Sequence, residues 1–213
     1  MGATRRDYYQ CERNEMLDFI SNNTAQILEI GPGEGLFGRV LKEKFNVQLW
    51  GIEQDSVSAE KASQYFDTIF CDDFKNVFSE LPEQYFDCVI FNDVLEHFED
   101  PWDVLQKVKK ILNDKGYIVA SIPNVRYWRN LQKLLLQKDW HYCEKGILDR
   151  THLRFFTKKS IMRLFKESGY QVDVIKGINP TSSRNYRIVN TLLFNLLNDC
   201  KWLQYAVKAR KGQ

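Results

Sequence analysis

Acidic residues and glycines alternate in one short stretch of the sequence, LEIGPGEGLFG (28–38). Glu29 lies two residues before Gly31, and Gly33 and Gly35 follow at the same interval. Glycines in such a loop allow a tight turn and let a ligand approach the backbone. A carboxylate beside the loop repels a phosphate and attracts a cation. The stretch therefore predicts a binding site for a ligand that carries positive charge.

The glycine spacing separates two classes of nucleotide ligand. A dinucleotide-binding loop has the pattern GxGxxG, whereas this loop has GxGxG and places Leu36 at the last position of the dinucleotide pattern. S-adenosylmethionine (SAM) carries an ammonium and a sulfonium group and has no phosphate. The spacing and Glu29 together favour SAM and oppose a dinucleotide oxidoreductase. Glu53, eighteen residues after Gly35, lies close to where an acid reaches ribose hydroxyls.

A second group of reactive side chains lies in the stretch DVLEH (93–97). Asp93, Glu96 and His97 follow a predicted strand, and His152 comes far along the chain. An imidazole at this place can act as a general base on an acceptor hydroxyl, and His97 and His152 are the candidates for that catalytic role. Two carboxylates and two imidazoles are also a donor set for a divalent metal. A third interpretation, in which these residues only orient and pack the loop, stays open.

The elements that must position these residues follow an alternating pattern. Short apolar runs alternate with amphipathic stretches, which is typical of a parallel sheet covered by helices. Pro101 opens one expected helix and Thr157 caps another. Strands are expected at 25–30, 47–52, 68–71, 86–92, 116–122, 170–176 and 202–209, and helices at 35–45, 101–112 and 157–169.

In this order, the motifs LEIGPGEG, GIEQD, CDD, FDCVIFNDVLEHFEDP and LNDKGYIVASIPN resemble those of class I SAM-dependent methyltransferases over roughly residues 20–177. The resemblance implies an α/β fold: a Rossmann-like seven-stranded sheet with helices on both faces and an antiparallel last strand. It implies SAM as cofactor and S-adenosylhomocysteine as product. The residues it implies for cofactor binding are Glu29, Gly31, Gly33, Gly35, Glu53, Gln54, Asp72, Asp73 and Asn92.

Two narrower resemblances concern the acceptor and the metal. DVLEH with a downstream histidine is similar to ubiquinone-biosynthesis O-methyltransferases and small-RNA 2′-O-methyltransferases, whose E-x-x-E-H stretch belongs to a metal site. Asp93 stands where those enzymes have glutamate, and because its side chain is shorter, no metal is expected here; Asp93, Glu96, His97 and His152 remain the candidate ligands. LDRTHLRFFT (148–157) resembles a phrase of polysaccharide-associated bacterial methyltransferases. It indicates a hydroxyl of a sugar or glycan precursor as acceptor.

The chain is expected to form a single domain over residues 1–213, with three segments outside the core pattern. Residues 1–24 are expected to form a helical cover over the cofactor cleft, in which Tyr8 or Tyr9 contacts a ligand or only packs. Residues 123–156 are expected to cover the acceptor side. Residues 178–200 are interpreted as an insertion before the last strand, whose apolar helix serves as core, dimer contact or membrane-surface patch.

Charge and composition limit the partners. The net charge is only +2, but residues 126–163 hold ten basic and three acidic residues. This imbalance suits an anionic or sugar-linked small molecule, while nucleic acid is not expected. Five cysteines without a CxxC pair, a polar N-terminus and no membrane-length apolar run predict a cytoplasmic protein. Two alternatives stay open: a metal-assisted RNA 2′-O-methyltransferase and a non-catalytic SAM-binding protein. The oligomeric state does not follow from the sequence.

Overall fold

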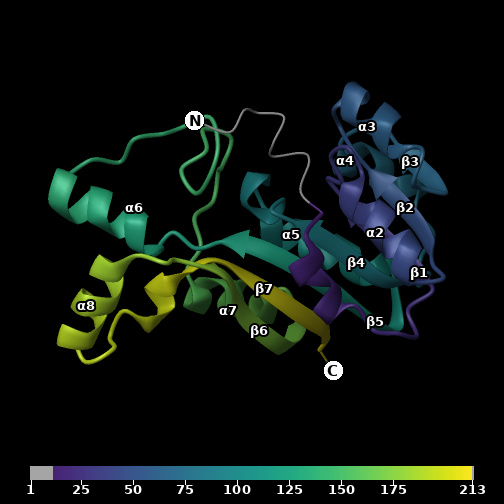
Figure 1. Ribbon diagram of the computed structural model, residues 1–213. Coiled ribbons are helices and arrows are strands. Elements are labelled where there is room, and N and C mark those ends of the chain that lie inside the picture. The colour runs from purple at the N-terminus through teal and green to yellow at the C-terminus, as the bar shows by residue number, and fades with distance from the viewer. Residues whose placement is uncertain (1–11, 213) are drawn as a thin grey trace.

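The computed structural model describes residues 12–212, and one seven-stranded sheet forms their centre (Figure 1). The strand order is β3-β2-β1-β4-β5-β7-β6. Only β7 is antiparallel to its neighbours β5 and β6. The predicted Rossmann-like sheet with an antiparallel last strand is therefore confirmed. The strands are β1 (Gln26–Ile30), β2 (Gln48–Ile52), β3 (Thr68–Phe70), β4 (Phe86–Asn92), β5 (Leu112–Pro123), β6 (Tyr170–Pro180) and β7 (Trp202–Lys211).

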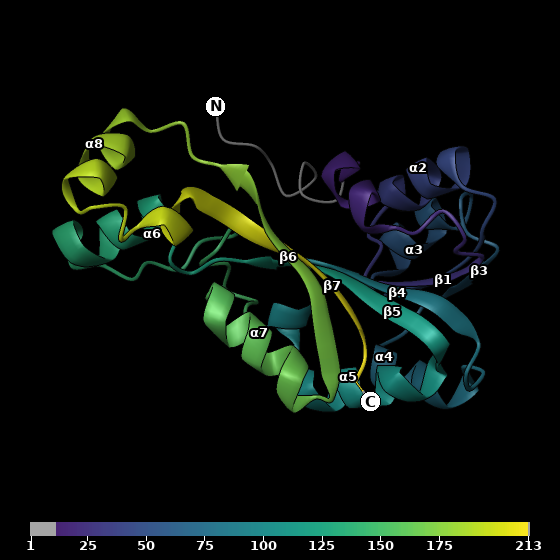
Figure 2. The same cartoon turned by 90° about the horizontal axis from the view of Figure 1, so that it is seen from below.

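Helices cover both faces of this sheet, as predicted (Figure 2). The 3₁₀ helix η1 (Asn14–Phe19), α2 (Leu36–Lys44) and α3 (Ser56–Ala62) cover one face and share a core with the sheet. The opposite face is covered by α4 (Phe74–Val77), α5 (Pro101–Ile111) and α7 (Lys158–Glu167), which bury a second core. The short 3₁₀ helices η2 (Phe78–Glu80) and η3 (Leu95–His97) join these layers.

The central strands are buried on both faces because helices lie above and below them. Four of the five β1 residues and five of the seven β4 residues are buried, which explains their continuous apolar runs. Two helix starts agree with the sequence. Asp100 caps α5 by accepting from the Asp103 amide at 3.0 Å, directly before Pro101. Thr157 and Ser160 form a reciprocal capping box at the start of α7.

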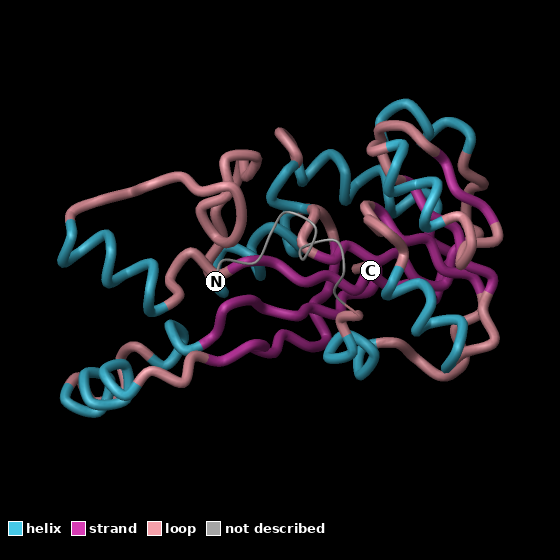
Figure 3. The backbone as a smooth tube through the Cα atoms, turned by 45° about the horizontal axis from the view of Figure 1, so that its top comes forward, coloured by secondary structure: helices cyan, strands magenta, loops and turns pink. Residues whose placement is uncertain are grey.

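A helical arm leaves the sheet at the end opposite β3 (Figures 1 and 3). It consists of α6 (Trp128–Gln132), the π-helix η4 (Lys133–Gln137), α8 (Arg184–Leu192) and the 3₁₀ helix η5 (Asn198–Lys201). β6 runs to Pro180, so the first three residues of the predicted 178–200 insertion belong to a strand. Among the described residues, no helix is both long and apolar enough to span a membrane.

Candidate active site

A cavity of about 790 Å³ lies where β1, β2 and β4 end. Ligands in open α/β sheets bind at the carboxyl ends of the strands. The cavity begins at the glycine loop and the acids after β2 and β3, passes Asn92, and reaches His97 and His152 at its other end. Residues 144–147 and 149–152 also line it. It is one continuous space, large enough for a cofactor and a second molecule.

The glycine loop has the backbone that its composition predicts. Gly31 and Gly33 have φ values of +68° and +58°, in the left-handed region that glycine adopts without penalty. A Cβ on Gly31 would lie 2.7 Å from Cγ2 of Val94. Gly35 has φ +81° and caps α2, and its Cβ would lie 2.8 Å from the backbone of Ala62. Gly31 and Gly33 line the cavity, whereas Gly35 serves the packing of α2 against α3.

Glu29 and Asn92 form a buried polar pair at the base of the cavity. The Asn92 amide donates to Oε1 of Glu29 at 3.1 Å. Oε2 of Glu29 and Oδ1 of Asn92 have no hydrogen-bond partner among the described residues. Burial raises the pKa of Glu29 to about 7, against the lowering effect of the Asn92 bond. Two buried acceptors without a donor fit a ligand that supplies N–H groups and positive charge.

The acids after β2 and β3 lie where the sequence places them. Glu53 is buried, and its two carboxylate oxygens accept from the amides of Gly33 at 2.9 Å and Asp55 at 3.0 Å. These bonds tie the end of β2 to the glycine loop. Asp72 is exposed at the rim, where the hydrogen bond from Asn76 lowers its pKa. Gln54 and Asp73 also line the cavity, and Asp73 caps α4 as well.

Two imidazoles meet at the other end of the cavity. The ring centroids of His97 and His152 lie 4.7 Å apart. Nδ1 of His97 is 3.2 Å from the Thr151 carbonyl, and Nδ1 of His152 is 3.0 Å from the Ile147 carbonyl. Since a carbonyl only accepts, each Nδ1 carries the proton and each Nε2 keeps its lone pair. Burial, and then the neighbouring His97, lower the pKa of His152, which favours its neutral form.

Glu96 completes a cluster behind these rings. Its side chain is buried, and neither carboxylate oxygen has a hydrogen-bond partner among the described residues. Burial and the charge of Asp93 raise its pKa well above the usual value. One donor atom from each of Glu96, His97 and His152 lies within 4.8 Å of the other two. An imidazole whose Nδ1 is fixed by a carbonyl is the usual form of a metal-ligating histidine, so these residues fit a divalent cation.

Asp93, the fourth candidate ligand, faces a different set of partners. It accepts hydrogen bonds from Arg13 at 2.7 Å, Ser121 at 3.0 Å and the Gln204 amide. With φ +55°, its backbone turns the chain sharply at the end of β4. The structure therefore brings three of the four candidate ligands together and leaves Asp93 in a network that joins Arg13 to β5 and β7.

The comparisons with known proteins identify the family of the chain. A family model described as a methyltransferase domain matches residues 1–174, most of the chain. The chain belongs to this methyltransferase family. It is a SAM-dependent methyltransferase. The search of curated proteins returned no significant match.

Solved structures share the fold at low sequence identity. A SAM-dependent methyltransferase from Archaeoglobus fulgidus superposes with a TM-score of 0.72 and 18% identity, covering 98% of this chain and 95% of that one. A SAM-dependent methyltransferase from Mesorhizobium loti gives 0.65 and 16%, covering 94% and 97%. One from Aquifex aeolicus gives 0.62 and 12%, covering 93% and 88%. These likenesses concern the fold and leave the acceptor open.

Several cavity residues of the methyltransferase escape sequence reasoning. Arg13 comes from the N-terminal segment, Asn179 from the end of β6, and Leu203 and Gln204 from β7. Only the alternation of side chains along β7 indicates which of its residues face inward, and nothing in the sequence connects Arg13 with Asp93. Tyr8 and Tyr9 lie outside the described residues.

The predicted acceptor-side cover, 123–156, divides into two parts. Pro123 and residues near 144–152 line the cavity, while 126–140 lie outside its lining. Arg126 forms an ion pair with Asp199, and Trp128 packs on Tyr186 with ring centroids 5.8 Å apart. Arg126 and Trp128 of this segment therefore stabilise the arm and do not line the cavity.

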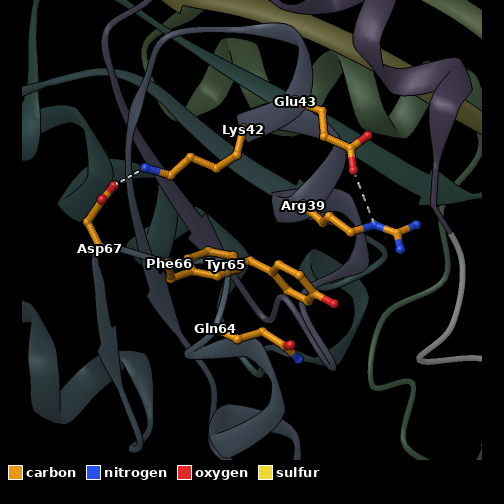
Figure 4. A pocket seen from close by; sticks show the side chains of 7 residues that line it. All are labelled: Arg39, Lys42, Glu43, Gln64, Tyr65, Phe66 and Asp67. Carbon is orange, nitrogen blue, oxygen red and sulfur yellow. Dashed lines mark hydrogen bonds and ion pairs between the residues drawn. The ribbon is translucent and has the colours of Figure 1, made fainter.

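A second hollow, of about 360 Å³, lies beside α2 (Figure 4). Its two cations are already ion-paired, Lys42 with Asp67 and Arg39 with Glu43. It is shallow and shares no lining residue with the larger cavity. The methyltransferase site is therefore assigned to the large cavity.

Proposed function

We propose that this methyltransferase transfers a methyl group from SAM to a hydroxyl of a small sugar-linked or anionic acceptor. The observation that carries the proposal is the single cavity, which has two oxygens without a hydrogen-bond partner among the described residues, Oε2 of Glu29 and Oδ1 of Asn92, at one end and two imidazoles at the other. Such an arrangement holds a cationic cofactor and a weakly acidic acceptor in one space, and orientation supplies much of the rate in methyl transfer.

The cofactor is proposed to bind along the strand ends. Its ammonium group supplies the donors that Oε2 of Glu29 and Oδ1 of Asn92 lack. Glu53 lies next, in position for the ribose hydroxyls, and Asp72 with Gln54 and Asp73 lies at the rim for the adenine. Gly31 and Gly33 let the ligand approach the backbone, and Arg13 covers this end from the N-terminal segment.

The acceptor is proposed to bind between residues 144–152 and the ends of β6 and β7. Thr151, Asn179 and Gln204 offer neutral hydrogen-bonding groups there. Both charge signs are present, because Arg150 is ion-paired with Glu144 at 3.3 Å. Neutral donors and acceptors among balanced charges suit a polyhydroxylated molecule.

In the proposed reaction, the acceptor oxygen attacks the methyl carbon of SAM in line with the sulfur. The C–S bond breaks as the C–O bond forms, and S-adenosylhomocysteine leaves as a neutral thioether. Nε2 of His152 or His97 takes the hydroxyl proton. This base role follows from the Nδ1 bonds, which leave both Nε2 lone pairs available.

A second candidate mechanism is metal-assisted. It is favoured by Glu96, whose buried carboxylate has no hydrogen bond among the described residues and lies 3.9 Å from Nε2 of His152. Glu96, His97 and His152 would hold the cation, which would lower the pKa of the acceptor hydroxyl. The same chemistry would serve an RNA 2′-hydroxyl. An RNA acceptor predicts binding that weakens steeply as salt rises, whereas a small neutral sugar predicts binding with little salt dependence.

The experiment measures S-adenosylhomocysteine release with a panel of sugar nucleotides, sugar phosphates and short RNAs. It uses wild type, His152→Ala and His141→Ala, the last being the exposed third histidine outside the cavity. The proposal expects turnover on a hydroxylated small molecule, lost in His152→Ala only. Turnover confined to RNA would contradict it. Loss of activity on chelation, with calorimetric Zn²⁺ or Mg²⁺ binding abolished in Glu96→Ala, would select the metal-assisted mechanism.

We also propose one domain over residues 1–213, with the N-terminal segment as a cover, because helices pack on both faces of a single seven-stranded sheet. A reducing, cytoplasmic compartment is part of the proposal. It is supported by the free state of the four described cysteines, Cys71, Cys88, Cys143 and Cys200.

A further inference from the structure

The outer part of the helical arm, residues 126–138 and 184–198, exposes apolar side chains away from the cavity. Of the thirteen large hydrophobic residues that are exposed in the described chain, eight lie here. The other five are scattered over the rest of the molecule. Contiguous exposed apolar surface of this kind marks an interaction site. The eight are Leu134, Leu135, Leu136, Ile188, Leu192, Leu193, Phe194 and Leu196.

This exposure is built into a folded unit. Trp128, Tyr186 and Cys200 form a small core of their own between α6 and α8. The Asn190 side chain donates to Asn198 at 2.8 Å and accepts from the Leu197 amide at 2.9 Å, which fixes the turn after α8. The arm therefore keeps its shape while its apolar tip faces outward.

The turn itself presents Phe194. This residue is 91% exposed, and its φ of +49° is unusual for a phenylalanine. The next residue, Asn195, has φ +65°. Left-handed backbone at a bulky residue persists only where the surroundings hold it, and it clusters at functional positions. The structure thus fixes an aromatic side chain at a convex apex.

Basic residues predominate around the tip. Residues 126–138 and 184–198 contain six basic residues and no acid, and one acid, Asp139 or Asp199, directly follows each range. Arg126 is ion-paired with Asp199, and the other five cations are exposed. An apolar surface flanked by cations complements a bilayer that contains anionic lipid, where apolar groups enter the interface and cations contact the headgroups. These five are Arg129, Lys133, Lys138, Arg184 and Arg187.

We propose that the arm docks the methyltransferase on the surface of an anionic membrane. α6 with η4, and α8 with its turn, both lie at the same extremity of the molecule and diverge toward their ends (Figures 1 and 3). Both tips can therefore meet one plane. The proposal does not depend on which acceptor is methylated.

The test is cosedimentation of the full chain with vesicles of phosphatidylcholine, with or without phosphatidylglycerol. Wild type is expected to bind only the anionic vesicles, and less as salt rises. Leu136→Ser with Phe194→Ser is expected to lower the partition coefficient by at least about tenfold, because two apolar side chains no longer enter the interface. Arg184→Gln and Arg187→Gln should each lower it about fivefold.

Two matched variants control for surface change in general. Val57→Ser removes an apolar side chain of similar exposure (58%) on α3, and Lys44→Gln removes a cation at the end of α2. Both are expected to bind vesicles as wild type does, and all variants should keep affinity for S-adenosylhomocysteine. Absent binding of wild type to anionic vesicles, or equal binding of the Phe194 variant, would overturn the proposal. A dimer that light scattering detects and the tip variant dissolves, without vesicle binding, would also overturn it.

Discussion

The cofactor end of the cavity is formed by the ends of parallel strands. The acceptor end is formed by an irregular segment and an antiparallel pair of strands. In the first region, β1 pairs with β2 and β4 in continuous register, which places Glu29, Glu53 and Asn92 around one point. In the second, carbonyls of the 144–152 segment hold the two histidines. Side chains fixed by sheet register are readable from local motifs, and side chains fixed by loops depend on contacts distant in sequence.

The largest expected effect is a loss of activity from a change at the acceptor end alone. His152→Ala removes an Nε2 lone pair at the acceptor end and leaves the strand ends untouched. We expect kcat to fall by about a hundredfold to ten-thousandfold. Affinity for S-adenosylhomocysteine, measured by calorimetry, should stay as in wild type. His141→Ala is the control, and a large loss of cofactor affinity in His152→Ala would show that the two ends are not independent.

The converse variant attacks the cofactor end. Glu29→Gln keeps the shape of the side chain but removes its negative charge. That charge lies where Oε2 has no hydrogen-bond donor among the described residues. A hydrogen bond to a charged group contributes about 1.5–3 kcal/mol, so affinity for S-adenosylhomocysteine should fall about tenfold to a hundredfold. Glu83→Gln, at an exposed glutamate before β4, is the matched control. Unchanged affinity in Glu29→Gln would show that the ammonium group does not bind at this position.

The raised pKa of Glu29 predicts a pH dependence with a definite sign. Its folded-state pKa of about 7 lies above the usual 4.5, so the empty protein loses stability as pH rises between those values. Binding of an ammonium group requires the carboxylate, which is about one-tenth populated one pH unit below the pKa. Affinity for S-adenosylhomocysteine should therefore rise about tenfold from about pH 6 to about pH 8 in isothermal titrations. A profile equally steep in Glu29→Gln would assign the titration to another group.

The smallest effect concerns Gly35, which the sequence groups with the cofactor residues. Gly35→Ala places a methyl group against Ala62 in left-handed backbone. A penalty of about 1–2 kcal/mol is expected, which lowers Tm by about 2–8 °C for a chain of this size. Affinity for S-adenosylhomocysteine should stay unchanged in the folded variant. A loss of affinity for S-adenosylhomocysteine without a decrease in Tm would show that Gly35 belongs to the cofactor site.

The same contrast explains which features of the fold and the site can be predicted from the sequence. The strands and the glycine loop follow from apolar runs, glycine spacing and caps such as Thr157, all of which are local features. Gln204 and Asn179 enter the cavity only because β7 and β6 pair across a long excursion of the chain. Arg13 meets Asp93 across eighty positions in the sequence. Local patterns cannot encode such contacts, so the sequence does not show that Asp93 pairs with Arg13 and stays apart from the other three candidate metal ligands.

The cofactor is predicted to bind in one orientation, and a crystal structure with S-adenosylhomocysteine tests this orientation most directly. We expect the amino group on Glu29 and Asn92, the ribose on Glu53, the adenine beside Asp72, and the sulfur facing His97 and His152. A ligand bound in the reverse direction, or with its sulfur turned away from the two imidazoles, would contradict the assignment of the two ends.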